Sequence, residues 1–242
     1  MSVAALLVAG FSVAWAVNED GAATWPLARG NYWIYEGDIK WVEENGSTHK
    51  NEVRSKKMTW RSEVVDVFET REGTLWLLRG FPTDLAWYTS GDKPQDRLLL
   101  RSGTDYYQIA GEKAAELFQK IRSKPEVLRQ AGDDAPGQVE AALLLPMPLA
   151  EGKRFGAGTT LGELFSSRYC YVVESVTPFA EKSVRNCPRL VDPKCYSITS
   201  STNPDHSVLS FVPGLGITHY AYSHHGTTME VDVVLVEFGQ KP

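Results

Sequence analysis

The residues best suited to chemistry in this chain are its histidines. There are five of them: His49, His206, His219, His224 and His225. The adjacent pair at 224 and 225, close to His219 on the preceding strand-like run, has the residue type of a metal site. A metal centre needs three or four converging ligands with hydrogen-bonded support, and a histidine pair in a turn supplies one or two. We therefore expect a solvated turn there, with no metal and no other cofactor.

Nucleophilic catalysis requires a serine, a cysteine or a similar group beside a base. The sequence has no G-x-S-x-G, and Cys170 lies in an alternating run two positions from Arg168. That arginine is able to lower the pKa of the thiol, but a cysteine in a packed strand is more often inert. The glycines of residues 214–216 stand between two strand-like runs, which excludes a dinucleotide-binding loop. The sequence predicts a protein that is not an enzyme.

Aromatic side chains are the third group with a chemical use, the binding of apolar molecules. The candidates on strand-like runs of the first half are Trp33, Tyr35, Trp60, Trp76 and Trp87. Most aromatic residues on strands form the core and cross-strand pairs. The alternative is that these five line a concave apolar groove for a lipid, an acyl chain or a lipoprotein, as in many β-barrels. They are our candidate ligand-binding residues.

Strands must position these aromatic residues, and the first half of the chain has the pattern of successive strands. Apolar and polar residues alternate from Tyr32, and NGS at residues 45–47 predicts a hairpin turn. A long polar return strand follows over residues 49–61, and later runs include DLAWYTS at 84–90. Turn signals recur about every 8–12 residues, the rhythm of an antiparallel meander. From Cys170 onward the chain is again strand and turn.

One segment is helical instead. Its apolar residues at helical spacing are Ala114, Leu117, Phe118 and Ile121. Ser123 and Glu126, three residues apart, are typical of a capping box that would begin a second short helix. We expect the helix at Ala114 to Ile121, within a helical insert of residues 111–131, to cover the aromatic groove as a lid.

The chain also repeats itself. PLARGNYW at residues 26–33 returns as PLAEGKRF at residues 148–155, so that Gly30 corresponds to Gly152 and Trp33 to Phe155. These residue types are common, and coincidence is the alternative. We interpret the repeat as the opening of two structural halves, residues 24–110 and 145–239, joined by the insert within one domain of residues 24–242. The expected fold class is mainly β: a large curved antiparallel sheet, as a half-barrel or a two-lobed sandwich, with one or two short helices near 111–131.

Residues 1–16 form an apolar run that ends in Ala14-Trp15-Ala16. The run is short for a membrane span, and its small-residue end is typical of a cleaved signal peptide. No Lys or Arg precedes it, so a short uncleaved anchor and a buried N-terminal element are the alternatives. We expect an exported protein that is periplasmic or associated with the cell envelope.

Export permits disulfides. Cys187 and Cys195 flank PRLVDPK, and we expect them to pair and to leave Cys170 as a buried thiol. A bridge from Cys170 to either of the others is the alternative, because connectivity does not follow from sequence.

The net charge of the chain limits the classes of partner that it can bind. The chain has 25 Lys and Arg against 30 Asp and Glu, a net charge of −5. No basic excess is present to neutralise a phosphate backbone, so we expect no nucleic-acid partner.

The opening PLARGNYWIYEG and the closing SFVPGLGITHYAY with EVDVVLVEF together resemble a loose group of uncharacterised bacterial exported proteins. In that group a PL-x-x-G-x-x-W-x-Y opening and a PG-x-G hairpin bracket a β-rich domain. The resemblance implies an architecture similar to the periplasmic lipoprotein carriers, which are curved half-barrels with a helix in the concave side. It brings no catalytic residue with it. We expect a non-enzymatic exported protein that binds an apolar ligand, such as a lipid or lipoprotein, or a protein of the envelope. A structural or accessory subunit of a membrane-associated envelope complex is the alternative.

Overall fold

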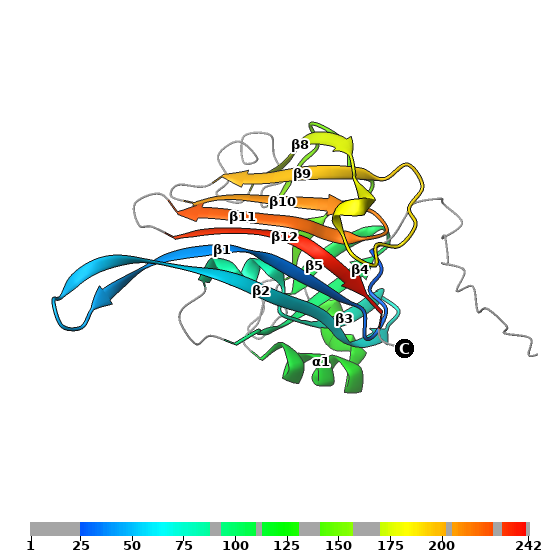
Figure 1. Cartoon of the computed structure of the whole chain (residues 1–242). Helices are drawn as coiled ribbons and strands as arrows, with labels where there is room; N and C mark the ends of the chain where they lie inside the picture. Colours follow the sequence, from blue (N-terminus) through cyan, green and yellow to red (C-terminus); the bar gives the residue numbers. More distant parts are fainter. Residues whose placement is uncertain are drawn as a thin grey trace, which may run out of the picture.

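The computed structural model describes residues 25–87, 93–109, 113–130, 141–156, 170–201, 205–224 and 229–240. In this part of the chain one antiparallel sheet of 12 strands has the order β6-β5-β4-β3-β2-β1-β12-β11-β10-β9-β8-β7. The sheet curves until it nearly closes into a barrel, with β6 and β7 as its end strands (Figure 1). The predicted fold class, a large curved antiparallel sheet, is confirmed. The expected leader, residues 1–16, lies outside the described residues.

Consecutive strands pair with one another in each half of the chain. The strands of the first half are β1 (Tyr32–Asn45), β2 (Lys50–Glu69), β3 (Thr74–Arg79), β4 (Asp96–Ser102), β5 (Asp105–Ile109) and β6 (Ala141–Leu145). Those of the second half are β7 (Arg154–Gly156), β8 (Cys170–Pro178), β9 (Lys194–Ser201), β10 (Asp205–Val212), β11 (Gly216–His224) and β12 (Glu230–Gly239). The two halves join where β1 pairs with β12, from Tyr32 opposite Gly239 to Lys40 opposite Glu230.

The helical elements are few and short. They are α1 (Ala114–Ser123) and the 3-10 turns η1 (Pro82–Trp87), η2 (Pro125–Gln130) and η3 (Glu181–Ser183). The expectation of a strand at residues 84–90 is wrong over residues 84–87, which belong to η1. Proline is favoured at the first helical position because its missing N–H leaves no hydrogen bond unmade, and Pro82 begins this turn.

The predicted hairpin between β1 and β2 is confirmed. Asn45 pairs with Lys50, and the Asn45 side-chain oxygen Oδ1 accepts hydrogen bonds from the backbone N–H groups of Ser47 (3.0 Å) and Thr48 (3.2 Å). An asparagine that bonds its own turn in this way stabilises the reversal locally.

Two separate apolar clusters lie on the two faces of the sheet, and β3 contributes to both. Trp76 and Leu78 belong to the cluster inside the curve, whereas Leu75 and Leu77 belong to the cluster on the outer face. Successive side chains of a strand point to opposite faces, so a strand buried on both sides is a continuous apolar run.

The helix α1 packs on the outer face. Phe118 and Ile121 are fully buried against Leu75 and Leu98 in the outer cluster, which contains none of the four candidate aromatic residues whose side chains the structure describes. The predicted helix is confirmed, but its predicted place as a lid over those aromatic residues is wrong. In the described part of the chain no helix is long and apolar enough to cross a membrane.

The two copies of the PLA-x-G motif form the same turn. Gly30 N donates to the Val64 carbonyl (2.9 Å), and Val64 N donates to the Asn31 carbonyl (2.9 Å). In the second copy Gly152 N donates to the Val173 carbonyl (2.8 Å), and Val173 N donates to the Lys153 carbonyl (2.9 Å). Both glycines have a positive φ, 86° and 80°, which a residue without a Cβ adopts at low cost.

The equivalence extends beyond the turn. The side chain of Asn31 donates to the Pro26 carbonyl (2.8 Å), and that of Lys153 donates to the Pro148 carbonyl (2.9 Å). Pairing shifts by one residue directly after the bonded valine in each half, between residues 64 and 66 and between residues 173 and 175. These observations show that the two halves share local structure at these turns. That the two halves arose by duplication stays a prediction.

Candidate functional site

Trp33 and Tyr35, the first two candidate ligand-binding residues, lie side by side along β1 in the interior of the sheet. Only 2% of each residue is exposed. Trp33 Nε1 donates to the Leu215 carbonyl (2.6 Å), and the Tyr35 hydroxyl donates to the Ile217 carbonyl (2.9 Å). Burial raises the pKa of Tyr35, so its hydroxyl remains a hydrogen-bond donor. The polar atoms of both rings are therefore used within the protein itself.

Trp60 on β2 and Trp76 on β3 are also buried, with 6% of each residue exposed. Trp60 Nε1 donates to the Gly80 carbonyl (2.8 Å), and the Trp76 ring stacks on Tyr106 with centroids 6.1 Å apart. Trp87 lies in η1 rather than on a strand, and its side chain is outside the described part of the chain. The lining of a ligand groove by these residues stays a prediction.

The centre of the interior is occupied by Trp25, which the sequence pattern does not single out. Its ring centroid lies 5.5 Å from that of Phe211, 5.8 Å from that of Tyr106 and 6.2 Å from that of Phe81. Its backbone N–H donates to the Tyr106 hydroxyl at 3.2 Å. Aromatic pairs at such distances pack favourably, and they make Trp25 part of the interior cluster.

Histidines form pairs with carboxylates on neighbouring strands. His219 Nε2 lies 2.9 Å from Asp232 Oδ1, and His224 Nδ1 lies 2.6 Å from Asp205 Oδ1. The Tyr222 hydroxyl donates to the same Asp205 oxygen at 2.7 Å. Residue 225 lies outside the described chain, and within that chain no group of three or more His, Cys, Asp or Glu side chains could hold a metal ion.

The expected disulfide is not formed in this structure, where Cys170, Cys187 and Cys195 are all free thiols. Burial and the nearby Glu181 raise the pKa of Cys187 to about 11, and burial raises the pKa of Cys195. Thiols are poor nucleophiles while protonated. The two cysteines act here as small apolar residues packed against the interior cluster.

One buried ion pair was missed by sequence reasoning. Asp84 in η1 accepts a hydrogen bond from Arg97 Nε on β4, and only 6% of the aspartate side chain is exposed. The two residues lie far enough apart in sequence that no local pattern predicts their contact. The pair fixes the short turn η1 against the sheet, since a buried charge is stable only with a partner.

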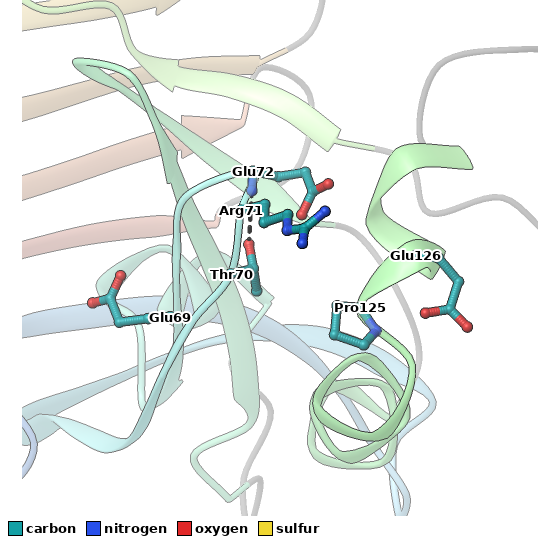
Figure 2. Close-up of a pocket in the computed structure, with 6 residues that line it drawn as sticks. All are labelled: Glu69, Thr70, Arg71, Glu72, Pro125 and Glu126. Atoms are coloured by element: carbon teal, nitrogen blue, oxygen red, sulfur yellow. Dashed lines mark hydrogen bonds between the residues drawn. The ribbon is translucent and has the colours of Figure 1, made fainter.

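The surface also has a groove between the β2–β3 turn and η2, with a volume of about 520 Å³. Figure 2 shows its lining residues, which include three glutamates and Arg71, and the Thr70 hydroxyl that accepts the Glu72 N–H at 3.1 Å. The carboxylates of Glu69 and Glu126 do not converge with that of Glu72. The groove therefore has the character of an open, solvated surface.

The hairpin of β1 and β2 projects beyond the rest of the sheet (Figure 1). The pairing of β1 with β12 ends at Lys40, whereas β1 and β2 pair onward to Asn45 and Lys50. We call residues 41–54 the ribbon. Val53 near its base is 61% exposed, one of few large apolar residues so exposed in the described chain. The sequence signals the ribbon only as a long polar strand.

The ribbon contributes little to the stability of the sheet. Its ion pairs are those of Arg54 with Glu43 (3.3 Å) and Glu52 (2.9 Å), and of His49 with Glu44 (2.9 Å). Exposed ion pairs of this kind contribute about 0–1 kcal/mol each, and a two-stranded hairpin alone is marginally stable in water. A projecting element that the fold does not need is the best candidate for a functional surface.

Comparisons with known proteins place the chain beside two solved structures. No family model matches the chain, and no curated protein matches it. One structure, from Bacteroides fragilis, is provisionally described as an exported protein with a YmcC-like fold. It shares 9% sequence identity with this chain at a TM-score of 0.42. The aligned region covers 90% of this chain and 100% of the Bacteroides chain. The other, from Parabacteroides distasonis, is provisionally described as a lipoprotein. It shares 11% sequence identity with this chain at a TM-score of 0.39, and the aligned region covers 90% of this chain and 99% of the Parabacteroides chain. Likenesses of this size leave the function to be argued from the residues of this chain.

Proposed function

We propose that this chain is an exported, non-enzymatic binding protein of the cell envelope, and that the ribbon docks a protein partner. The observation that carries the proposal is the ribbon itself, which extends past β12 and exposes backbone and side chains on both sides. Export is supported by the leader pattern of residues 1–16. The non-enzymatic role is supported by the raised pKa of the partly buried Cys187 and Cys195 thiols and by the pairing of His219 and His224 with carboxylates.

A shortened chain tests the proposal. Trp41 and Arg54 are cross-strand neighbours, so residues 42–53 can be replaced by Asn-Gly, a sequence that closes two-residue hairpins. We expect the full chain, crosslinked in its own cells, to yield a defined protein adduct that the shortened chain does not yield. The urea midpoint of the shortened chain should remain close to that of the full chain, because the ribbon adds little stability. An adduct that persists unchanged without the ribbon contradicts the proposal.

The other expectation, an apolar ligand, has less support because the polar atoms of the candidate residues Trp33 and Tyr35 are bonded within the protein and the two rings are buried. Native mass spectrometry of the purified protein separates the two. We expect the mass of the polypeptide alone, and a stoichiometric lipid adduct would favour the ligand instead.

An accessory subunit held at the membrane by its leader is the remaining alternative. N-terminal sequencing of protein from its source distinguishes it, since a start at Val17 indicates a released protein and an intact Met1 indicates an anchored one.

A further inference from the structure

One side of β2 has no pairing strand over much of its length. β2 pairs with β1 from Lys50 to Glu63, but it pairs with β3 only from Glu63 onward. We call residues 50–62 the β2 edge, because within the described chain no strand bonds their other side. Such an edge presents a row of free backbone N–H and C=O groups, the template on which another strand can pair.

The β2 edge is basic although the chain is acidic. Its sequence, KNEVRSKKMTWRS, has five basic residues and one acidic residue, in a chain with a net charge of −5. Lys50 and Lys57 are both exposed, opposite Asn45 and Asp38 in the pairing of β2 with β1. Arg54 and Arg61 are exposed as well, each paired with a glutamate. The edge therefore carries an excess of basic side chains beside unpaired backbone groups, although Asp38 of β1 lies opposite Lys57.

We propose that the β2 edge binds an acidic segment of a partner protein, which lies along it in extended conformation and pairs as an added strand. This inference rests on the proposed function, and it names the partner's chemistry. Main-chain hydrogen bonds would supply affinity, while alternate side chains would supply specificity. The lysines select carboxylates opposite them. Val53, paired with Val42 and exposed, offers an apolar contact to one side chain of the segment.

The same features disfavour a second copy of this chain. Two β2 edges aligned antiparallel about their middle would bring Lys56 and Lys57 of one copy beside those of the other, and like charges opposite one another destabilise a sheet. Nucleic-acid phosphates and anionic lipid phosphates meet the charge of the edge, but their oxygens only accept hydrogen bonds and leave its backbone C=O groups without donors. An acidic strand meets both requirements.

A capped ten-residue peptide of alternating Glu and Val is the probe, followed by fluorescence anisotropy with the full chain. We expect saturable binding that weakens as salt rises, because screening shortens the reach of the charges. The variant Lys50→Glu with Lys57→Glu should bind about tenfold more weakly, since it replaces two attractive pairs by two repulsive ones. The matched control is Lys120→Glu with Lys124→Glu near α1, which changes the net charge equally and should bind like the parent chain.

Two further readouts separate strand pairing from charge alone. A peptide with the same residues but N-methylated at alternate positions lacks donors along one side, and we expect it to bind about tenfold more weakly. Hydrogen exchange should show slowed amides within residues 50–62 when the unmodified peptide is bound, and this measurement also shows that each variant is folded.

Several outcomes overturn the inference. They are equal binding of a Lys–Val peptide, no effect of N-methylation, equal weakening by both charge variants, or tighter binding of anionic vesicles or single-stranded DNA at the same edge. The proposed function fails separately, through the crosslinking experiment. If the ribbon is needed for the adduct while Lys50→Glu with Lys57→Glu leaves it unchanged, the ribbon docks a partner of other chemistry.

Discussion

Inside the curved sheet, Asp84 accepts a hydrogen bond from Arg97 Nε through Oδ1, while its Oδ2 meets no partner in the described chain. Burial raises the pKa of Asp84 above its ordinary value of 3.8, and the charge of Arg97 opposes this rise. When the pKa of an acid is higher in the folded state than in the unfolded state, the folded protein binds more protons at a given pH. The contribution of the acid to stability is therefore greatest at low pH and falls as pH rises from about 3.8.

The variant Asp84→Asn tests this balance. We expect the difference in unfolding free energy, parent minus variant, to become smaller as pH rises from about 4 to about 7. Urea unfolding of both proteins across that range measures it, and other titrating groups cancel in the difference. A difference that grows with pH would mean that Arg97 dominates and lowers the pKa.

Gly152 provides a second prediction for a single residue. Its φ of 80° is unfavourable for any residue with a Cβ, although no neighbour would touch an added methyl group. We expect Gly152→Ala to lower the unfolding free energy by about 1–2 kcal/mol through backbone strain alone. Gly46 in the hairpin also has open space around it, without a positive φ, and Gly46→Ala should be close to neutral. Equal effects of the two changes in chemical denaturation would refute the argument.

Among the elements, sequence periodicity predicted what is local. The hairpin at residues 45–47, the helix at Ala114 and the antiparallel meander follow from patterns within one segment. The side of the sheet on which α1 packs does not follow from such patterns. The spacing of apolar residues in a helix shows that one face of the helix is buried, but it does not show which surface of the protein that face contacts. Whether the aromatic residues line a groove does not follow from sequence either, and the groove stays a prediction. Burial of Trp33 depends on Leu215 and Phe238, which lie at the far end of the chain.

Phe118 tests the place of the helix. The side chain is fully buried between α1 and the outer face, so Phe118→Ala should cost about 3–5 kcal/mol in unfolding free energy. The near-ultraviolet circular dichroism of the interior tryptophans should stay unchanged under native conditions, because they lie in the other cluster. Leu117→Ala, a half-buried neighbour on the same helix, serves as the control and should cost less. A large change in the tryptophan signal would place the helix against the interior.

Across the whole molecule, the two halves are joined unequally. β1 and β12 pair along nine positions, from Tyr32 to Lys40, whereas β6 and β7 stand at opposite ends of the strand order without pairing. The matching turns at Gly30 and Gly152 relate β1 to β7, and by the same correspondence β12 relates to β6. On the predicted repeat of the two halves, the seam of β1 with β12 corresponds to that of β6 with β7, and hydrogen bonds close only the first.

Hydrogen exchange distinguishes the two seams. We expect amides of Ala141–Leu145 and Arg154–Gly156 to exchange faster than those of β12, because the end strands are bonded on one side only. Equal protection of β6, β7 and β12 would show that the second seam is also paired in solution.

The position of Trp25 has a consequence for how the chain can be trimmed. The indole and its neighbour Leu27 are nearly inaccessible, with 6% and 4% exposed, and they reach the centre from the very beginning of the described chain. A chain that started at residue 29 would leave a dry void among rings, and such voids admit small aromatic guests. Trp25 and Leu27 thus occupy space within the sheet that a shortened chain would leave open, and we expect that chain to gain a binding cavity for small aromatic molecules.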